Sequence, residues 1–501
     1  MAGQTAWYGL SSIAARFLNY LLTPYLTNPS HLKVTEYGQM STLYAAIPFL
    51  NVIFTYGMET AYFRFVQKDT HKNDIYSTSM ISMIGSTIFL TGALLLLRTN
   101  LTHLLKLQNY PEFITLSIFI IALDTLTTLP FAKLRQDGRP RKFAVIRILS
   151  ITINIIFIYF FLSVLPNIMA KNPNSFLGFM YIKDYGVGYV IIANLIASFI
   201  TLILLSKEFF SFKIRFNTVL WKRMIVYALP LILAGFAGMI NETFDRIMLL
   251  WWTRPTPEFD AETQVGIYSA CYKLSLLITL FIQAFRMGAE PFFFKQAEQE
   301  NPQRVYARVM KFFVITITTM FLLVTLYLDI WKYFIRNEKM WVGLKVVPIL
   351  LLANMFLGIY YNLAIWYKIT HKTLAGAYIT IIGAVITLII NYFFIPNFSY
   401  MACAWATFAC YGSMMVVSFI WGQREYRIPY AWRKLCAYII IVVLLFFLHQ
   451  ALIHIWHNRY FNLGLATLLL FIYVWFIATV ERKDFQRLPV VGRFFKDKVK
   501  S

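Results

Sequence analysis

Charge is scarce in this chain. Asp, Glu, Lys and Arg make up 14% of the 501 residues, whereas hydrophobic residues make up 59%. Soluble globular domains carry about 25% charged residues, so this composition excludes an ordinary soluble protein. What the chain has instead is fourteen apolar stretches, each near the roughly 20 residues that a helix needs to cross a bilayer.

These stretches lack the alternation of a transmembrane barrel, so we predict an all-α integral membrane protein with about 14 helices. The expected spans are 5–27, 39–63, 75–97, 113–132, 143–166, 185–205, 224–252, 265–294, 309–329, 344–367, 374–395, 400–422, 435–453 and 460–480. The first is too long and too charged for a cleaved signal peptide. No loop between the spans is long enough to form a folded domain.

Residues for several common chemistries are missing or isolated. The four cysteines contain no Cys-x-x-Cys pair, which argues against a disulfide framework or a zinc site. His449, His454 and His457 cluster in or near the last outer loop, where no nearby carboxylate or cysteine completes a metal site. There is no Walker A loop. We therefore expect no metal, no enzyme activity and no cofactor beyond a coupling H⁺ or Na⁺.

The net charge of +23 reports topology. With the N-terminus in the cytoplasm, inner segments hold about three times as many Lys and Arg residues as outer loops, which fits the positive-inside rule. We predict that both termini are cytoplasmic. The basic residues, including the tail 481–501, are then expected to contact anionic lipid, and we expect no nucleic-acid partner.

An internal repeat divides the chain. Gly57-Met-Glu59-Thr-Ala-Tyr-Phe63-Arg64 closes span 2, and Gly288-Ala-Glu290-Pro-Phe-Phe-Phe294-Lys295 closes span 8. The same offset places Tyr37 on Tyr268. A repeat of six spans predicts two parallel six-helix lobes, 1–205 and 206–422, followed by helices 13 and 14 at 423–480.

A few charges interrupt the spans, and these are the best candidates for function, because a charge inside a membrane is costly. In span 7, Glu242, Asp245 and Arg246 follow i, i+3, i+4 spacing, which predicts that they share one helix face. One interpretation is a Glu242–Arg246 pair that stabilises the helix. The other is a carboxylate that exchanges H⁺ or Na⁺ while Arg246 tunes it.

Spans 1, 4 and 8 add further candidates. Arg16 lies near the middle of span 1 with Asn19 on the same face, and Asp124 lies at comparable depth in span 4. These two charges either pair with each other, or Arg16 contacts an anionic substrate while Asp124 titrates. Lys273 either snorkels to the surface or points into a cavity that receives phosphate.

Arg286 and Glu290 form an i, i+4 pair near the inner end of span 8, and Glu59 is the repeat mate of Glu290. Because these residues lie close to the headgroups, we predict a structural or gating role for them more than substrate binding.

Three segments resemble the polysaccharide-transport branch of the multidrug/oligosaccharidyl-lipid/polysaccharide exporter superfamily, which includes bacterial O-antigen flippases. They are Gly9 to Pro24 with the following Tyr37-Gly38, the Asp245-Arg246 pair, and Val265-Gly-Ile-Tyr268-Ser-Ala-Cys-Tyr272-Lys273. The 6+6+2 layout extends the resemblance over nearly the whole chain.

The resemblance implies two lobes around a V-shaped cavity in a bacterial inner-membrane protein. An undecaprenyl-pyrophosphate-linked oligosaccharide would pass its head group through the cavity, driven by an ion gradient or the membrane potential. Glycan polymerases and glycosyltransferases would be partners. Lipid II flippases are similar in placing basic residues on helices 1, 2 and 8. Arg16 and Lys273 could fill two such places, but span 2 has only Arg64, at its end.

The sequence therefore predicts substrate-binding residues Arg16, Asn19, Arg246 and Lys273, and ion-coupling residues Asp124, Glu242 and Asp245. Two alternatives stay open. A drug/cation antiporter of the same superfamily would favour a more acidic cavity. A membrane polymerase or ligase acting on polyprenyl-linked sugars would need a large outer loop.

Overall fold

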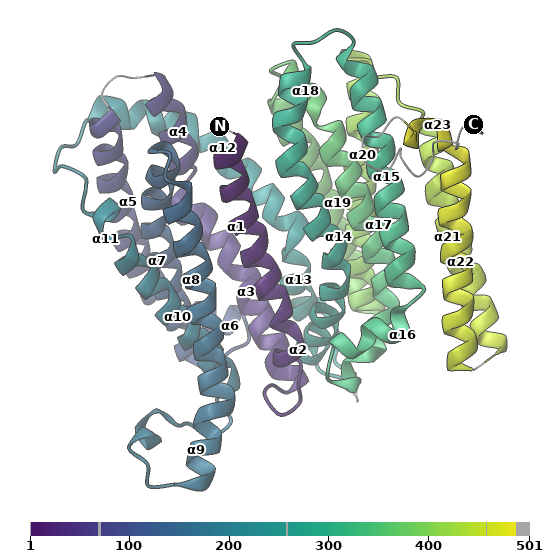
Figure 1. Ribbon diagram of the computed structural model, residues 1–501. Coiled ribbons are helices and arrows are strands. Elements are labelled where there is room, and N and C mark those ends of the chain that lie inside the picture. Colours follow the sequence, from purple (N-terminus) through teal and green to yellow (C-terminus); the bar gives the residue numbers. More distant parts are fainter. Residues whose placement is uncertain (1, 69–71, 257–258, 457, 487–501) are drawn as a thin grey trace, which may run out of the picture.

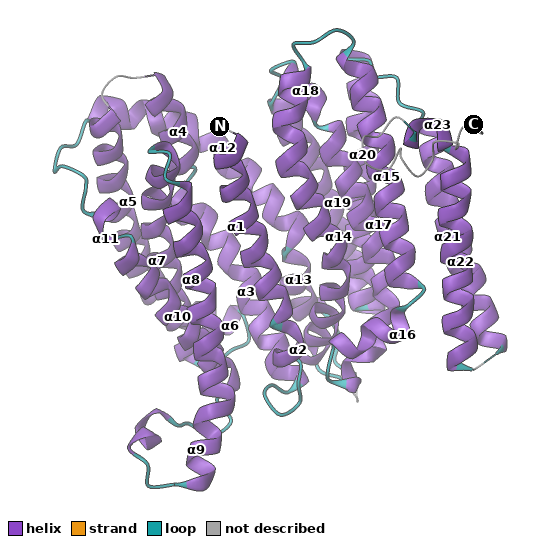
Figure 2. Ribbon diagram, in the orientation of Figure 1, coloured by secondary structure: helices purple, strands orange, loops and turns teal. Residues whose placement is uncertain are grey.

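The computed structural model describes residues 2–68, 72–256, 259–456 and 458–486, and these residues form an all-helical bundle without a strand (Figures 1 and 2). The helices of the first part of the chain are α1 (Ala2–Leu21), α2 (Thr23–Leu26), α3 (Val34–Thr55), α4 (Met58–Lys68), α5 (Lys72–Leu96), α6 (Arg98–Leu104), α7 (Pro111–Gln136), α8 (Pro140–Tyr159), α9 (Leu165–Lys171), α10 (Gly186–Leu204) and α11 (Ser206–Phe209).

The second part begins with a long helix that is broken once and ends with a helical hairpin. Its helices are α12 (Thr218–Glu242), α13 (Phe244–Trp252), α14 (Ala261–Gln296), α15 (Pro302–Thr325), α16 (Leu328–Trp331), α17 (Val347–Leu363), α18 (Ile365–Ile369), α19 (Leu374–Phe398), α20 (Tyr400–Glu425), α21 (Trp432–Ile455), α22 (Arg459–Val480) and α23 (Arg482–Phe485).

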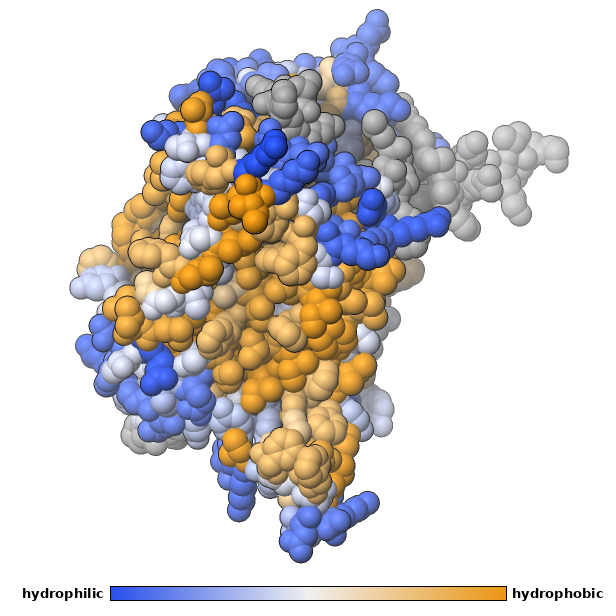
Figure 3. All heavy atoms as spheres, turned by 90° about the vertical axis from the view of Figure 1, so that its left-hand side faces the viewer, coloured by the Kyte–Doolittle hydropathy of each residue, from blue (hydrophilic) through white to orange (hydrophobic). Residues whose placement is uncertain are grey.

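Among the described residues, 12 helices are long and apolar enough to cross a membrane, or up to 13 if the bent pair α3–α4 is one span. The all-helical membrane fold is thus confirmed. The predicted count of fourteen is not, although α1 and α2 occupy the first expected range. On the face in Figure 3, hydrophobic side chains cover the middle, and hydrophilic ones gather toward the two ends.

Helix packing in the first part recurs in the second. In the first, α1 packs on α8, α3 and α5 pack on α7, and α10 packs on α7 and α8. In the second, α12 packs on α19, α14 and α15 pack on α17, and α20 packs on α17 and α19. We call these groups the first half (α1–α10) and the second half (α12–α20). Their packing follows the predicted six-helix repeat, while the residue limits 205 and 422 stay predictions.

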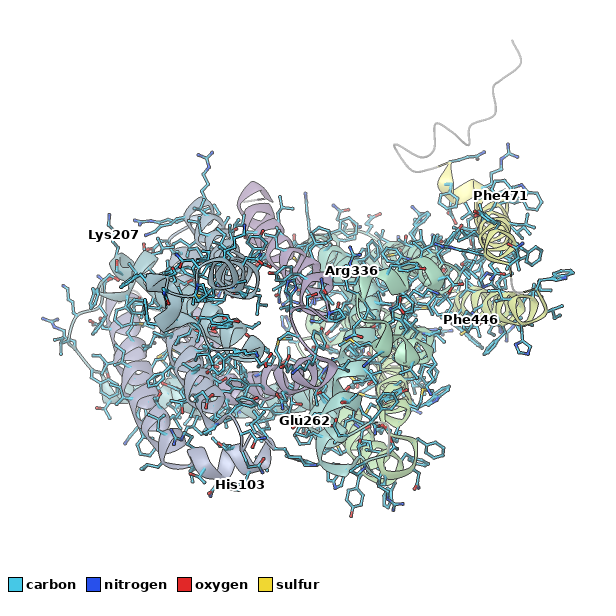
Figure 4. All side chains as sticks on the ribbon, turned by 90° about the horizontal axis from the view of Figure 1, so that it is seen from below. His103, Lys207, Glu262, Arg336, Phe446 and Phe471 are labelled. Carbon is cyan, nitrogen blue, oxygen red and sulfur yellow. The ribbon has the colours of Figure 1, made fainter. Side chains whose placement is uncertain are left out.

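The hairpin α21–α22 contacts the second half through α15 and forms one edge of the molecule (Figures 1 and 4). The start of α1 and the short α23 lie at the same end of the bundle, which we call the terminal end; α9 marks the opposite end (Figure 1). Residues 487–501, most of the predicted basic tail, and His457 lie outside the described residues. His449 lies inside α21 and is buried, so it belongs to the bundle and not to the loop.

Candidate functional site

The charged part of span 7 is interrupted by a break in the helix. α12 ends at Glu242, Thr243 leaves the helical conformation (φ −136°, ψ −17°), and α13 begins at Phe244. The break turns neighbouring side chains in different directions: Glu242 is exposed, whereas Asp245 is buried. The prediction that Glu242, Asp245 and Arg246 share one face therefore holds for Glu242 and Arg246, which line one cavity, and is wrong for Asp245, because it assumed a continuous helix.

Asp245 is held by three hydrogen bonds. Its Oδ1 accepts from the backbone N–H of Arg246 at 2.8 Å and from Nη1 of Arg246 at 3.0 Å. Its Oδ2 accepts from the hydroxyl of Tyr268, on α14, at 2.6 Å. A buried carboxylate needs such partners to offset its lost hydration. Asp245 thus fixes both the Arg246 guanidinium and the packing of α13 on α14.

Arg246 pairs with Asp245 and bonds to the backbone of Glu242. Its Nη1 donates to the backbone carbonyl oxygen of Glu242 at 3.1 Å, and its guanidinium carbon lies 4.4 Å from the ring centroid of Tyr272. The Glu242–Arg246 ion pair, one of the two interpretations of span 7, is replaced by the pair with Asp245. No role was predicted for Tyr268 and Tyr272. Their i, i+4 spacing predicts that both rings lie on the same face of one helix, and the Arg246 guanidinium lies over both.

A cavity of about 710 Å³ lies between α1, α12, α14, α17 and α20, and we call it the first cavity. Arg16, Glu242, Arg246 and Arg286 line it. The guanidinium groups of Arg16, Arg286 and Arg246 all act electrostatically on the Glu242 carboxylate. Arg286 also lies over the ring of Tyr361, 4.6 Å from its centroid. The first cavity is therefore polar, with three cations around one carboxylate inside an apolar bundle.

A second cavity of about 430 Å³ lies on the other side of Arg246, toward the α9 end. Thr243 and Arg246 line both cavities. Asn19 and Lys273 line only the second, so the structure separates them from Arg16, with which they were grouped. Arg246 is the charged residue common to both. Both volumes fall within the range of about 300–1,000 Å³ typical of small-molecule sites.

Asp124 belongs to neither cavity lining. Its Oδ1 accepts a hydrogen bond from the hydroxyl of Ser198, on α10, at 2.7 Å, and the charge of Arg147 acts on it. No ion pair joins Asp124 to Arg16 among the side chains described, so the first of the two alternatives for these charges, that they pair with each other, is not found. Arg147 was not among the predicted candidates, although it lies within the expected span 143–166 and within α8.

The glutamates of the two repeats both form ion pairs. Glu59 pairs with Arg135, at the end of α7. Glu290 pairs with Lys368, on α18, at 2.6 Å, and with Arg286 at 3.1 Å. The predicted Arg286–Glu290 pair is therefore present. In each half the glutamate ties the second expected span to the end of the fourth, which makes these contacts structural; a gating role stays a prediction.

The two halves meet closely at the α9 end. Gly38 of α3 and Gly266 of α14 allow the two backbones to touch: a Cβ on Gly38 would clash with the carbonyl oxygen of Glu262, and one on Gly266 with that of Val34. Gln39 donates to the Glu262 carboxylate at 2.8 Å. In Figure 4, which views this end, Glu262 lies where the helices of the two halves meet.

Two further hydrogen bonds join the halves there. Lys106, after α6, donates to the carbonyl oxygen of Leu250 at 2.8 Å, and the indole of Trp251 donates to the carbonyl oxygen of Leu104 at 2.8 Å. Both link the α6 region of the first half to α13 of the second. Backbone-close packing and these bonds close the α9 end.

The comparisons with known proteins agree with this architecture. The family described as "polysaccharide biosynthesis protein" matches residues 2–297, more than half of the chain. The chain belongs to this family. The MatE family also matches, over residues 256–393. No protein with a curated description matches the chain in sequence.

Solved structures share the fold at low sequence identity. Lipid II flippase MurJ in an inward closed conformation has a TM-score of 0.72 at 12% identity, covering 95% of this chain and 99% of that one. An inward-facing multidrug resistance MATE family transporter of the MOP superfamily has a TM-score of 0.63 at 13% identity, covering 87% and 95%. A MATE protein in complex with MaL6 has a TM-score of 0.59 at 12% identity, covering 87% and 96%.

Members of the polysaccharide biosynthesis protein family and these structural relatives are membrane transporters and flippases and not enzymes. The chain is therefore a multi-pass membrane transporter of this superfamily, and the polymerase or ligase alternative is discarded. Such transporters need no cofactor. Among the side chains described, no group of three or more His, Cys, Asp or Glu residues could hold a metal ion.

Proposed function

We propose that the protein moves a polyprenyl-pyrophosphate-linked oligosaccharide, such as an O-antigen, capsule or exopolysaccharide unit, from the inner to the outer leaflet of the bacterial inner membrane. The observation that carries this proposal is the first cavity. Arg16, Arg246 and Arg286 surround it, while Glu242 is its one carboxylate. A guanidinium binds phosphate oxygens through two parallel hydrogen bonds, so this cavity suits a pyrophosphate.

The polyprenyl tail would stay in the lipid while the head group enters the cavity. With the terminal end in the cytoplasm, as the loop charges predict, the closed α9 end faces the outer side. Loading would then occur from the inner leaflet, and alternating access would open the Gly38–Gly266 contact. Glycosyltransferases that supply the substrate and a polymerase that consumes it would be its partners.

Coupling to an ion gradient would use carboxylates beside the pathway. Glu242 is exposed to the first cavity, and Asp245 and Asp124 are hydrogen-bonded within the bundle. Protonation or Na⁺ binding at Glu242 or Asp245 would change the charge next to Arg246, the charged residue common to both cavities. Asp245→Asn would then transport without its normal dependence on the gradient; an unchanged dependence in reconstituted vesicles would reject this role.

A multidrug antiporter is the second candidate, because the MatE family matches residues 256–393 and Glu242 shares its cavity with the rings of Tyr272, Tyr361 and Tyr411. Carboxylates and aromatic faces are groups that bind organic cations. Arg246 and Arg286 are paired with Asp245 and Glu290, but Arg16 has no ion pair among the described residues and opposes a cationic substrate by repulsion. We therefore propose a lipid-linked anion, and not an organic cation, as the first candidate for the substrate.

The deciding experiment uses proteoliposomes with a fluorescent polyprenyl-pyrophosphate disaccharide or with a lipophilic cationic dye. We expect wild-type protein to move the lipid and not the dye, and Arg16→Ala to lose movement of the lipid, by about a hundredfold if a bidentate contact worth about 3 kcal/mol is removed. Arg98→Ala is the matched control, since Arg98 lies on α6 beside Thr115. Transport of the dye alone, or full activity of Arg16→Ala, would reject the proposal.

A further inference from the structure

The second cavity differs from the first in the chemistry of its walls. Amides and hydroxyls make up its polar surface, and Lys273 is its one charge besides Arg246. The polar side chains that matter here are Asn19, Ser41, Tyr44, Asn154, Asn194 and Ser269. Such groups donate and accept hydrogen bonds in many directions, as the hydroxyl groups of a sugar require.

Two of these polar atoms are buried without a partner. The hydroxyl oxygen of Ser269, a residue only 3% exposed, and Oδ1 of Asn154 have no hydrogen-bond partner among the described residues. An unsatisfied buried polar atom costs about 1–3 kcal/mol. Because both residues line the second cavity, a side-chain rotation that turns these atoms toward it would let a ligand with hydroxyl groups satisfy them.

Lys273 is partly buried and has no ion pair among the residues that the structure describes. The charge that acts on it is the guanidinium of Arg246, which is already paired with Asp245. A lone ammonium is a compact point charge, without the planar fork by which arginine grips phosphate. It therefore suits a ligand group with a single negative charge, such as a carboxylate.

We propose that the second cavity binds a carboxylate-bearing sugar of the transported glycan, with its carboxylate on Lys273 and its hydroxyl groups on Asn154 and Ser269. This inference rests on the proposed function, because it places the pyrophosphate in the first cavity on the other side of Arg246. It narrows the substrate class to oligosaccharides that contain an acidic sugar. Arg246 lies between the two subsites and contacts both parts of the head group.

The test measures binding to the purified full-length protein by calorimetry. The probes are a glucuronic acid-containing disaccharide, its neutral glucose-containing counterpart, and inorganic pyrophosphate. We expect wild-type protein to bind the acidic disaccharide about tenfold or more tightly than the neutral one, as one charge-assisted hydrogen bond predicts. Equal affinity for the two disaccharides, or binding of neither, would overturn the inference.

Variants of Lys273 test whether this residue causes the preference for the acidic disaccharide. Lys273→Gln should abolish the preference for the acidic disaccharide and leave pyrophosphate binding unchanged, and Lys273→Arg should retain most of the preference. Lys345→Gln is the matched control, because Lys345 lies against the ring of Tyr400 outside the cavity. A preference that survives Lys273→Gln would reject the proposed role.

The two proposals fail separately. If wild-type protein does not bind pyrophosphate, or Arg16→Gln binds it normally, the pyrophosphate site in the first cavity is wrong even where the sugar preference holds. If pyrophosphate binding depends on Arg16 but Lys273→Gln changes nothing, only the acidic-sugar inference is wrong.

Discussion

The two halves of the bundle repeat the same helix packing, but the Gly-x-Glu motif lies at a helix break in the first half and inside a continuous helix in the second. Glu59 and Glu290 both pair with a basic side chain at the end of the fourth expected span of their half, Arg135 on α7 and Lys368 on α18. In the first half, however, the helix breaks before the glutamate: α3 and α4 are bent by 41° at Tyr56 and Gly57. In the second half, α14 continues through Gly288 and Pro291 to Gln296.

The neighbours explain the difference. Gly57 has φ +71°, and a Cβ on it would lie 3.2 Å from the carbonyl oxygen of Ala228, so α12 of the second half packs directly against the break. Gly288 has open space around it. The corresponding contact of α1 with α14 uses a side chain, with Met287 Cε 2.8 Å from the Cβ position of Gly9. The contact of α12 at Gly57 is thus made by backbone atoms, whereas the contact of α1 with α14 is made by a flexible methionine side chain.

The largest loss of stability should follow from disrupting the contact of α3 with α14, the repeat-related helices through which the two halves touch at Gly38 and Gly266. Gly38→Ala forces a Cβ into the carbonyl oxygen of Glu262, so α3 and α14 must separate, and we expect a loss of about 3 kcal/mol or more in stability. The apparent melting temperature, followed by tryptophan fluorescence at one scan rate, measures it. Gly92→Ala, which meets no atom within 4 Å, is the control. Equal melting of both variants would show that this contact can relax.

The second prediction concerns a contact that the first half lacks, the attachment of α21–α22. Glu481, 2% exposed, accepts from Lys311 of α15 at 2.7 Å, from Lys434 at 2.5 Å, and from the hydroxyl of Tyr438. Burial would raise the pKa of Glu481, but these hydrogen bonds lower it below its usual value. Lys311 likewise lowers the pKa of Asp484.

A lowered carboxyl pKa contributes stability above the pKa of the unfolded chain, about 4.5 for Glu481, and this stability is lost as pH falls toward the folded value. Wild-type protein should therefore melt at a lower temperature at pH 4 than at pH 7. Glu481→Gln should cost about 1–3 kcal/mol at pH 7 and reduce the dependence on pH. The exposed Glu338→Gln is the control. The same pH dependence in Glu481→Gln would contradict this account.

The smallest predicted effect is the difference in stability between the alanine variants of the two repeat glycines, Gly57 and Gly288. Gly57→Ala places a Cβ at a left-handed φ beside Ala228 and should cost about 1–2 kcal/mol. Gly288→Ala lies within a helix in open space and should be neutral or stabilising by up to about 1 kcal/mol. Melting of the two variants under identical conditions measures the difference. Equal destabilisation would mean that the halves are more alike than their backbones indicate.

Several features could be predicted from residue order. Spacing predicted the Arg286–Glu290 pair, and the Gly-x-Glu match predicted that α3–α4 and α14 correspond. The partners of these glutamates, Arg135 and Lys368, could not be predicted, since they come from other helices. Asp124 likewise bonds to Ser198, on another helix. Arg147 could have been found, because it lies within an expected span.

The sequence by itself determined where the protein resides and how its helices are ordered, because the length of each apolar run and the cost of burying charge are properties of the chain and the bilayer. Only the tertiary structure decided which charges face a cavity. The break at Thr243 turns Glu242 toward the first cavity and Asp245 toward Tyr268, and it places Arg246 between two cavities. Side-chain directions follow backbone dihedrals, and a break of one residue redirects all that follow it.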